Sequence, residues 1–75
     1  MVEIALSIKF KKRFSKIKTQ DLKEQIIKLI QKIKINPEIG KPMRHERQGT
    51  REVYVRPFRL SYEYKENKVI ILEIY

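Results

Sequence analysis

Residues 51–74 read REVYVRPFRLSYEYKENKVIILEI, and this stretch decides the fold because it carries three strand signals in succession. Apolar and polar residues alternate over residues 53–56 and again over 58–64, which is the period of strands with one buried face. Glu66 and Asn67 lie between two lysines and favour a tight turn. Residues 69–72 are apolar without a break, which suits a strand covered on both faces. We therefore predict three consecutive strands joined by short turns.

The N-terminal segment predicts a strand followed by a short helix. Over residues 2–8, large apolar residues occupy every second position, which is again the period of a half-buried strand. Phe10, Phe14 and Ile17 then fall at the spacing of one helical face, and cations fill the other faces. This short helix should be strongly basic.

A second helix is the clearest element of the sequence. Thr19 is placed to cap its N-terminus, and Asp21 puts negative charge at the positive end of the helix dipole. The apolar stripe of this helix consists of Leu22, Ile26, Leu29, Ile30 and Ile33. Asn36-Pro37 ends the helix, because proline lacks the N–H for the next hydrogen bond and disfavours a helical predecessor.

The order of elements is β-α-α-β-β-β, and it predicts an α+β fold. We expect the helical hairpin to pack on one face of a mostly antiparallel four-stranded sheet. Residues 37–50 contain both glycines and two of the three prolines, so we interpret them as an ordered loop. The chain has 75 residues, which suits a single domain spanning residues 1–75.

Positive charge is the dominant feature of the composition. Lysine and arginine number 18 against 9 aspartates and glutamates, for a net charge of +9. Such a surface repels itself, and chains generally carry it where an anionic partner binds. Nucleic acid, an acidic protein segment and an anionic membrane surface are the candidate partners. Membrane binding is the weakest of them, because the apolar stripe of the second helix is needed for the core.

The composition also restricts chemistry and location. There is no cysteine, so disulfides, thiolate ligands and a cysteine nucleophile are excluded. The single histidine, His45, leaves a metal site without its usual ligands, and we expect no metal and no cofactor. No segment approaches the roughly 20 apolar residues of a spanning helix, and the first residues do not form a signal-peptide core. We therefore expect a cytoplasmic protein.

The second half of the chain carries a pattern found in a known superfamily. Its parts are Asn36-Pro37, Gly40-Lys41-Pro42-Met43-Arg44, Gly49, Arg51-Glu52-Val53-Tyr54-Val55 and Phe58-Arg59-Leu60-Ser61-Tyr62-Glu63. This pattern resembles the RelE/ParE toxin superfamily, where the run reads roughly N-P, G-K-P-L-(K/R), G, a strand, and (Y/H)-R-(I/L)-x-Y. The resemblance covers nearly the whole chain, including the β-α-α start.

The resemblance implies a toxin of a toxin–antitoxin pair, with two alternative activities. RelE-like members are metal-independent ribonucleases that cut messenger RNA in the ribosome, and ParE-like members poison DNA gyrase. In both branches a partner antitoxin holds the toxin inactive. We expect the RelE-like activity, with an acidic RelB-like antitoxin and mRNA on the ribosome as partners. A nucleic-acid-binding module without catalysis is a third alternative.

Cutting RNA without a metal requires a base for the 2′-hydroxyl, a proton donor for the 5′-oxygen and positive charge on the phosphate. Arginine suits the third role, because its planar fork binds phosphate oxygens bidentately and stays charged. Arg59 is the first candidate, since it matches the arginine of the superfamily pattern and should point away from the apolar face of Phe58 and Leu60. The alternative is a solvated arginine, or one paired with Glu63.

The resemblance also implies further site residues. Arg56 and Arg51 lie at or near positions where relatives carry basic residues, and they are further catalytic candidates. His45 is another, because Arg44-His45 resembles a K-H pair of one RelE-like branch and histidine exchanges protons near neutral pH. The expected RNA-binding residues are Arg44, Arg47 and Tyr54, although a strand tyrosine can also be simply packed.

Two departures from the superfamily concern catalysis. Many RelE-like members have lysines on the second strand where this chain has Glu52 and Tyr54, so the sequence does not identify the general base. Relatives usually continue past the last strand with a basic residue or histidine and then a tyrosine, whereas this chain ends at Tyr75. We assign Tyr75 to the last strand.

Overall fold

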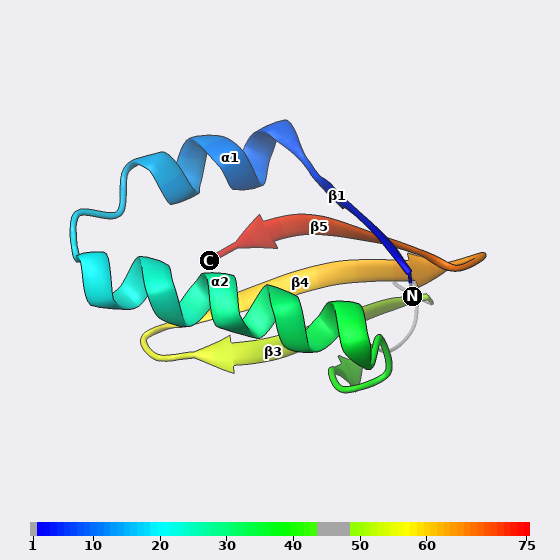
Figure 1. Ribbon diagram of the computed structural model, residues 1–75. Coiled ribbons are helices and arrows are strands. Elements are labelled where there is room, and N and C mark those ends of the chain that lie inside the picture. Colours follow the sequence, from blue (N-terminus) through cyan, green and yellow to red (C-terminus); the bar gives the residue numbers. More distant parts are fainter. Residues whose placement is uncertain (1, 44–48) are drawn as a thin grey trace.

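The computed structural model describes residues 2–43 and 49–75, which form two helices laid on one face of a sheet (Figure 1). The elements are β1 Glu3–Leu6, α1 Ile8–Ser15, α2 Gln20–Ile35, β2 Lys41–Pro42, β3 Thr50–Val55, β4 Phe58–Lys65 and β5 Lys68–Ile74. The sheet has five strands in the order β1-β5-β4-β3-β2. β1 runs parallel to β5, and the other neighbours are antiparallel.

The α+β class and the helical hairpin are confirmed, but the sheet is five-stranded and mixed, so the prediction of four strands was wrong. The extra strand, β2, is only two residues long and lies inside the segment interpreted as a loop. It pairs with Arg51 and Glu52 of β3. A two-residue strand containing a proline has no alternation to detect, which is why the sequence did not reveal it.

Two predicted boundaries also move. β3 ends at Val55, so Arg56 lies with Pro57 in the turn to β4 and not in the strand. β1 ends at Leu6, because the Ser7 side chain accepts a hydrogen bond from the Phe10 backbone N–H at 3.0 Å and thereby caps α1. Thr19 does occupy the N-cap of α2, but among the described residues its side chain forms no capping hydrogen bond.

The turn between β4 and β5 follows the sequence expectation. Glu66 and Asn67 have positive φ angles of 52° and 64°, and the flanking Lys65 and Lys68 are paired across the two strands. Two successive left-handed residues match the right-handed twist of a two-residue hairpin. The tight turn predicted here is confirmed.

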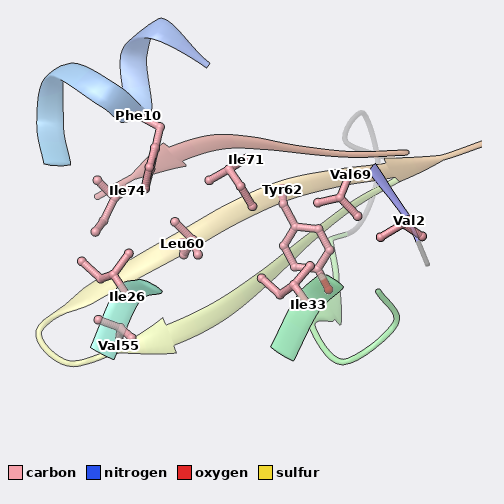
Figure 2. Packing of buried hydrophobic residues seen from close by; sticks show 10 residues of the cluster. All are labelled: Val2, Phe10, Ile26, Ile33, Val55, Leu60, Tyr62, Val69, Ile71 and Ile74. Carbon is pink, nitrogen blue, oxygen red and sulfur yellow. The ribbon is translucent and has the colours of Figure 1, made fainter. Parts of the chain in front are cut away.

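The core lies between the sheet and the two helices (Figure 2). Leu60 and Tyr62 of β4 are fully buried, as are Ile26 and Ile33 of α2. Phe10 of α1 points toward the end of β5. The face of the sheet that packs against the helices is called the inner face. Because side chains alternate along a strand, every second residue lies on the opposite, outer face. Arg59 therefore lies on the outer face, away from Leu60.

Candidate functional site

Three side chains form a row across the outer face. Tyr54 of β3 lies directly opposite Arg59 of β4. Tyr75 follows β5 and continues its ladder, because its backbone N–H donates to the Arg59 carbonyl at 2.9 Å and its carbonyl accepts from the Arg59 N–H at 2.6 Å. Residues directly opposite one another on adjacent strands share a face. Tyr54, Arg59 and Tyr75 are named the outer row below.

The guanidinium of Arg59 stacks on an aromatic ring and is accessible to an anion. Its guanidinium carbon lies 5.2 Å from the centre of the Tyr54 ring, which is a cation–π contact. Arg59 is exposed, and none of the described carboxylates forms a salt bridge with it. The alternative pairing with Glu63 is therefore not found. A stacked, charged guanidinium without a carboxylate partner is suited to binding a phosphate.

A carboxylate lies beside the outer row. The Tyr75 hydroxyl donates a hydrogen bond to Glu52 at 2.9 Å, and the Tyr54 hydroxyl lies 3.5 Å from the other oxygen of the same carboxylate. Glu52 precedes Tyr54 by two residues on β3, so alternation places both on the outer face. The site thus combines a guanidinium, a carboxylate and two phenolic hydroxyls.

Sequence reasoning did not assign Glu52 or Tyr75 to the site. For Glu52 a signal was present, because its two-residue spacing from Tyr54 predicts a shared face. Tyr75 had no such signal. Alternation from the buried Val69 and Ile71 would turn Tyr75 inward, but the register between β4 and β5 shifts at Ser61/Tyr62. This bulge turns Tyr75 to the outer face.

Arg51, predicted as catalytic, lies on the inner face. It pairs with Tyr62 in the register of β3 and β4. Its guanidinium donates hydrogen bonds to the backbone carbonyls of Glu38 at 3.1 Å and Gly40 at 2.9 Å. The structure therefore does not bring Arg51 together with Arg59. The contacts of Arg51 fasten the segment after α2 to the sheet.

Tyr62 completes this inner-face arrangement. It is 0 % exposed, and its hydroxyl donates to the Pro37 carbonyl at 2.7 Å and accepts from the Gly40 N–H at 2.8 Å. Burial raises the pKa of the Tyr62 hydroxyl, although the Gly40 N–H and the charge of Arg51 act in the opposite direction. Pro37, Gly40, Arg51 and Tyr62 are named the loop lock below.

Gly40 has a steric role in the loop lock. A Cβ atom added to it would come within 2.6 Å of the Tyr62 hydroxyl oxygen, much closer than van der Waals contact. Several residues of the superfamily pattern therefore contact one another and hold the fold together.

The other residues predicted for the site either lie apart from the outer row or fall outside the described residues. Arg56 is exposed in the β3–β4 turn, next to the outer row in sequence but not part of it. Arg44, His45 and Arg47 lie outside the described residues. In the part of the chain that the structure describes, no group of three potential metal-ligating side chains is found. Within residues 2–43 and 49–75, no helix is long and apolar enough to cross a membrane.

Comparison with known proteins identifies the family. The model of the ParE toxin of type II toxin–antitoxin systems, parDE, matches residues 4–75. The chain belongs to this family, and with it to the RelE/ParE superfamily of type II toxins. The superfamily expected from the residue pattern is confirmed. No curated protein sequence matches the chain.

Solved structures of low sequence identity share the fold. The toxin–antitoxin complex RelBE of Escherichia coli matches with a TM-score of 0.84 and 15% identity, covering 99% of this chain and 94% of that one. RelBE2 of Mycobacterium tuberculosis matches with a TM-score of 0.84 and 19% identity, covering 97% and 94%. The YoeB/ParE toxin of Agrobacterium tumefaciens has a TM-score of 0.84 and 15% identity, covering 96% and 94%.

Proposed function

We propose that this toxin is a RelE-like enzyme, a metal-independent endoribonuclease that cleaves mRNA on the ribosome and inhibits translation. The observation that supports the proposal is the arrangement on the outer face, where Arg59 is exposed and stacked on Tyr54, beside a carboxylate hydrogen-bonded to Tyr75. These groups match the chemical requirements of RNA cleavage without a metal. The ribosome as target places the enzyme in the cytoplasm.

The proposed reaction is an internal transfer at one phosphodiester. The 2′-oxygen forms a bond to the adjacent phosphorus while the bond to the 5′-oxygen breaks, leaving a 2′,3′-cyclic phosphate and a 5′-hydroxyl. Glu52 accepts the proton of the 2′-hydroxyl, and Arg59 binds the two non-bridging oxygens as charge builds on them. The Tyr75 hydroxyl gives its proton to the 5′-oxygen and regains one from Glu52, to which it is hydrogen-bonded. Both residues thus return to their starting states.

The test is addition of the purified chain to a cell-free translation extract. Toeprinting should show new mRNA ends at translating ribosomes, and the upstream fragments should carry cyclic phosphates. Glu52→Gln is the matched variant, because it keeps the shape and the hydrogen-bond acceptor but removes the base. We expect it to lower the cleavage rate by about 10²–10⁴-fold. Absence of mRNA cleavage by the wild-type chain would contradict the proposal.

A second candidate function is poisoning of DNA gyrase, and one observation favours it. The family model that matches residues 4–75 is described as a ParE toxin. The same extract discriminates the two functions when gyrase and relaxed plasmid are supplied. A RelE-like enzyme stops translation and leaves supercoiling unchanged, whereas a gyrase poison blocks supercoiling and leaves mRNA intact.

We also propose an acidic antitoxin of the RelB type as the partner. The net charge of +9 supports this, and the similar chains of Escherichia coli and Mycobacterium tuberculosis were crystallised in toxin–antitoxin complexes. A disordered acidic segment would order on contact and cover the arginines. Charge attraction mainly sets the association rate, so added salt should slow association more than it speeds dissociation. Equal association rates at low and high salt would contradict this explanation of the charge.

A further inference from the structure

Helix α1 carries a line of cations along one side. Lys9, Lys12 and Arg13 of α1 and its C-cap residue Lys16 are spaced i, i+3, i+4 and i+7 and therefore lie on one helical face. Phe10 occupies another face, where it is buried in the core. These four cations are named the α1 basic stripe.

The stripe borders a groove that leads to the outer row. Together with Glu73, Ile74 and Tyr75, the four cations line a hollow of about 210 Å³. α1 lies beside the C-terminal end of β5, at the end of the sheet opposite the β4–β5 hairpin (Figure 1). Tyr75 belongs to both features, because it lines the groove and donates its hydroxyl proton to Glu52. An anionic chain leaving Arg59 would therefore pass Tyr75 and enter the groove.

The charge of the groove is strongly positive and mostly uncompensated. Lys9 pairs with Glu73 at 3.4 Å. Across the described segments, the side chains of Lys12, Arg13 and Lys16 take part in no salt bridge. The side chains that line the groove thus include four cations and a single carboxylate, that of Glu73. Three of the cations remain available to phosphates.

The residues that line the groove favour RNA over other anions. Tyr75 is 38 % exposed at the junction with the outer row, where its ring offers a surface on which a base can stack. A membrane surface requires an apolar helix face lying in the interface, but Phe10 of α1 is 3 % exposed and already packed in the core. A positively charged groove combined with aromatic side chains for base stacking is the usual form of a single-strand binding site.

We propose that the α1 basic stripe binds the phosphates of single-stranded RNA adjacent to the phosphate held by Arg59. This inference rests on the proposed function and extends it, because it supplies the binding track that leads the RNA to the outer row. Lys9 is positioned by Glu73 at the edge of the groove, while Lys12, Arg13 and Lys16 bind successive phosphates.

The test is the binding of a fluorescein-labelled, 2′-O-methylated 12-nucleotide RNA, which lacks the 2′-hydroxyl needed for cleavage. Anisotropy titrations over a range of salt concentrations report how many phosphates are neutralised. Each contact to a single strand contributes about 0.7 to the slope of log affinity against log salt. Lys12→Gln/Arg13→Gln should therefore lower the slope by about 1.4, and Lys16→Gln alone by about 0.7.

The matched control is Lys65→Gln/Lys68→Gln, which removes the same charge from exposed positions in the hairpin at the other end of the sheet. Its salt slope should stay at the wild-type value. If the stripe variant keeps the wild-type slope, or the hairpin variant loses as much, the inference is wrong. Loss of affinity for poly-glutamate with unchanged RNA affinity would overturn it too, because the stripe would then bind protein.

The RNA-binding test of the α1 basic stripe can fail or succeed independently of the proposed enzymatic function. Because the RNA probe cannot be cleaved, its binding does not depend on catalysis. If the α1 basic stripe binds RNA but the wild-type chain does not cleave mRNA, the proposed enzymatic function is wrong and the inference about the stripe is supported. If mRNA cleavage depends on Glu52 but the stripe variant binds RNA normally, the enzymatic function is supported and the inference about the stripe is wrong.

Discussion

Two tyrosine and arginine pairs stand on opposite faces of the same strands. On the inner face Tyr62 is fully buried and shares the Gly40 backbone with Arg51 through hydrogen bonds. On the outer face Tyr54 is 59 % exposed and stacks on Arg59, which no described carboxylate neutralises. The superfamily pattern thus contains tyrosine and arginine residues with two different roles. On the inner face they stabilise the fold, and on the outer face they expose a positive charge. Alternation along β3 and β4 separates the two roles.

The strongest test of this division is Arg59→Ala. We expect the cleavage rate to fall by about 10³-fold or more, because the variant loses the charge placed on the transition-state phosphate. Because Arg59 is exposed, urea unfolding should give a free energy within about 0.5 kcal/mol of the wild type. A folded Arg59→Ala protein that cleaves mRNA at the wild-type rate would exclude Arg59 from the site.

On the inner face the corresponding change is Tyr62→Phe. It removes one hydroxyl and leaves the Gly40 N–H and the Pro37 carbonyl without their buried partner. We expect the free energy of unfolding to fall by about 1–3 kcal/mol, with little change in cleavage at temperatures where the variant is folded. Tyr54→Phe is the matched control on the outer face, and its stability should be unchanged. Equal destabilisation by both variants would contradict the division.

Arg51→Ala sharpens the comparison, because the sequence predicts a catalytic role for Arg51. Its two hydrogen bonds to loop carbonyls indicate a stabilising role instead. We expect a loss of about 1 kcal/mol in the free energy of unfolding and a cleavage rate within a few-fold of the wild type. If the folded Arg51→Ala protein cleaves as slowly as Arg59→Ala, the loop lock takes part in catalysis and our assignment is wrong.

The smallest expected effect is a dependence of stability on alkaline pH. Burial raises the pKa of the Tyr62 hydroxyl, so the unfolded chain loses this proton at a lower pH than the folded chain. Below about pH 10 the hydroxyl is protonated in both states, and its contribution is constant. Above that pH the unfolded state binds fewer protons, and the free energy of unfolding decreases. Urea titrations from pH 8 to 11 should show a steeper decrease for the wild type than for Tyr62→Phe. Parallel curves would contradict this origin.

Local patterns in the sequence predicted much of the fold. The stripe from Leu22 to Ile33 and the stop at Asn36-Pro37 agree with α2, which ends at Ile35. The turn at Glu66 and Asn67 was also correct. These features depend on the periodicity of apolar residues and on the local backbone preferences of proline and turn residues, which act over a few positions. The two-residue β2 and the parallel pairing of β1 with β5 depend on distant partners, and local patterns do not contain them.

For the candidate site, the sequence by itself determined that Arg59 faces away from Leu60 and that Glu52 and Tyr54 share a face, because the side-chain period of a strand is two. Only the tertiary structure decided that Arg51 binds the loop after α2 and that Tyr75 reaches Glu52, 23 residues away in the chain. The reason is register. A single bulge between β4 and β5 turns Tyr75 outward beside Arg59. Such a one-residue shift reverses the face of every later side chain in the strand.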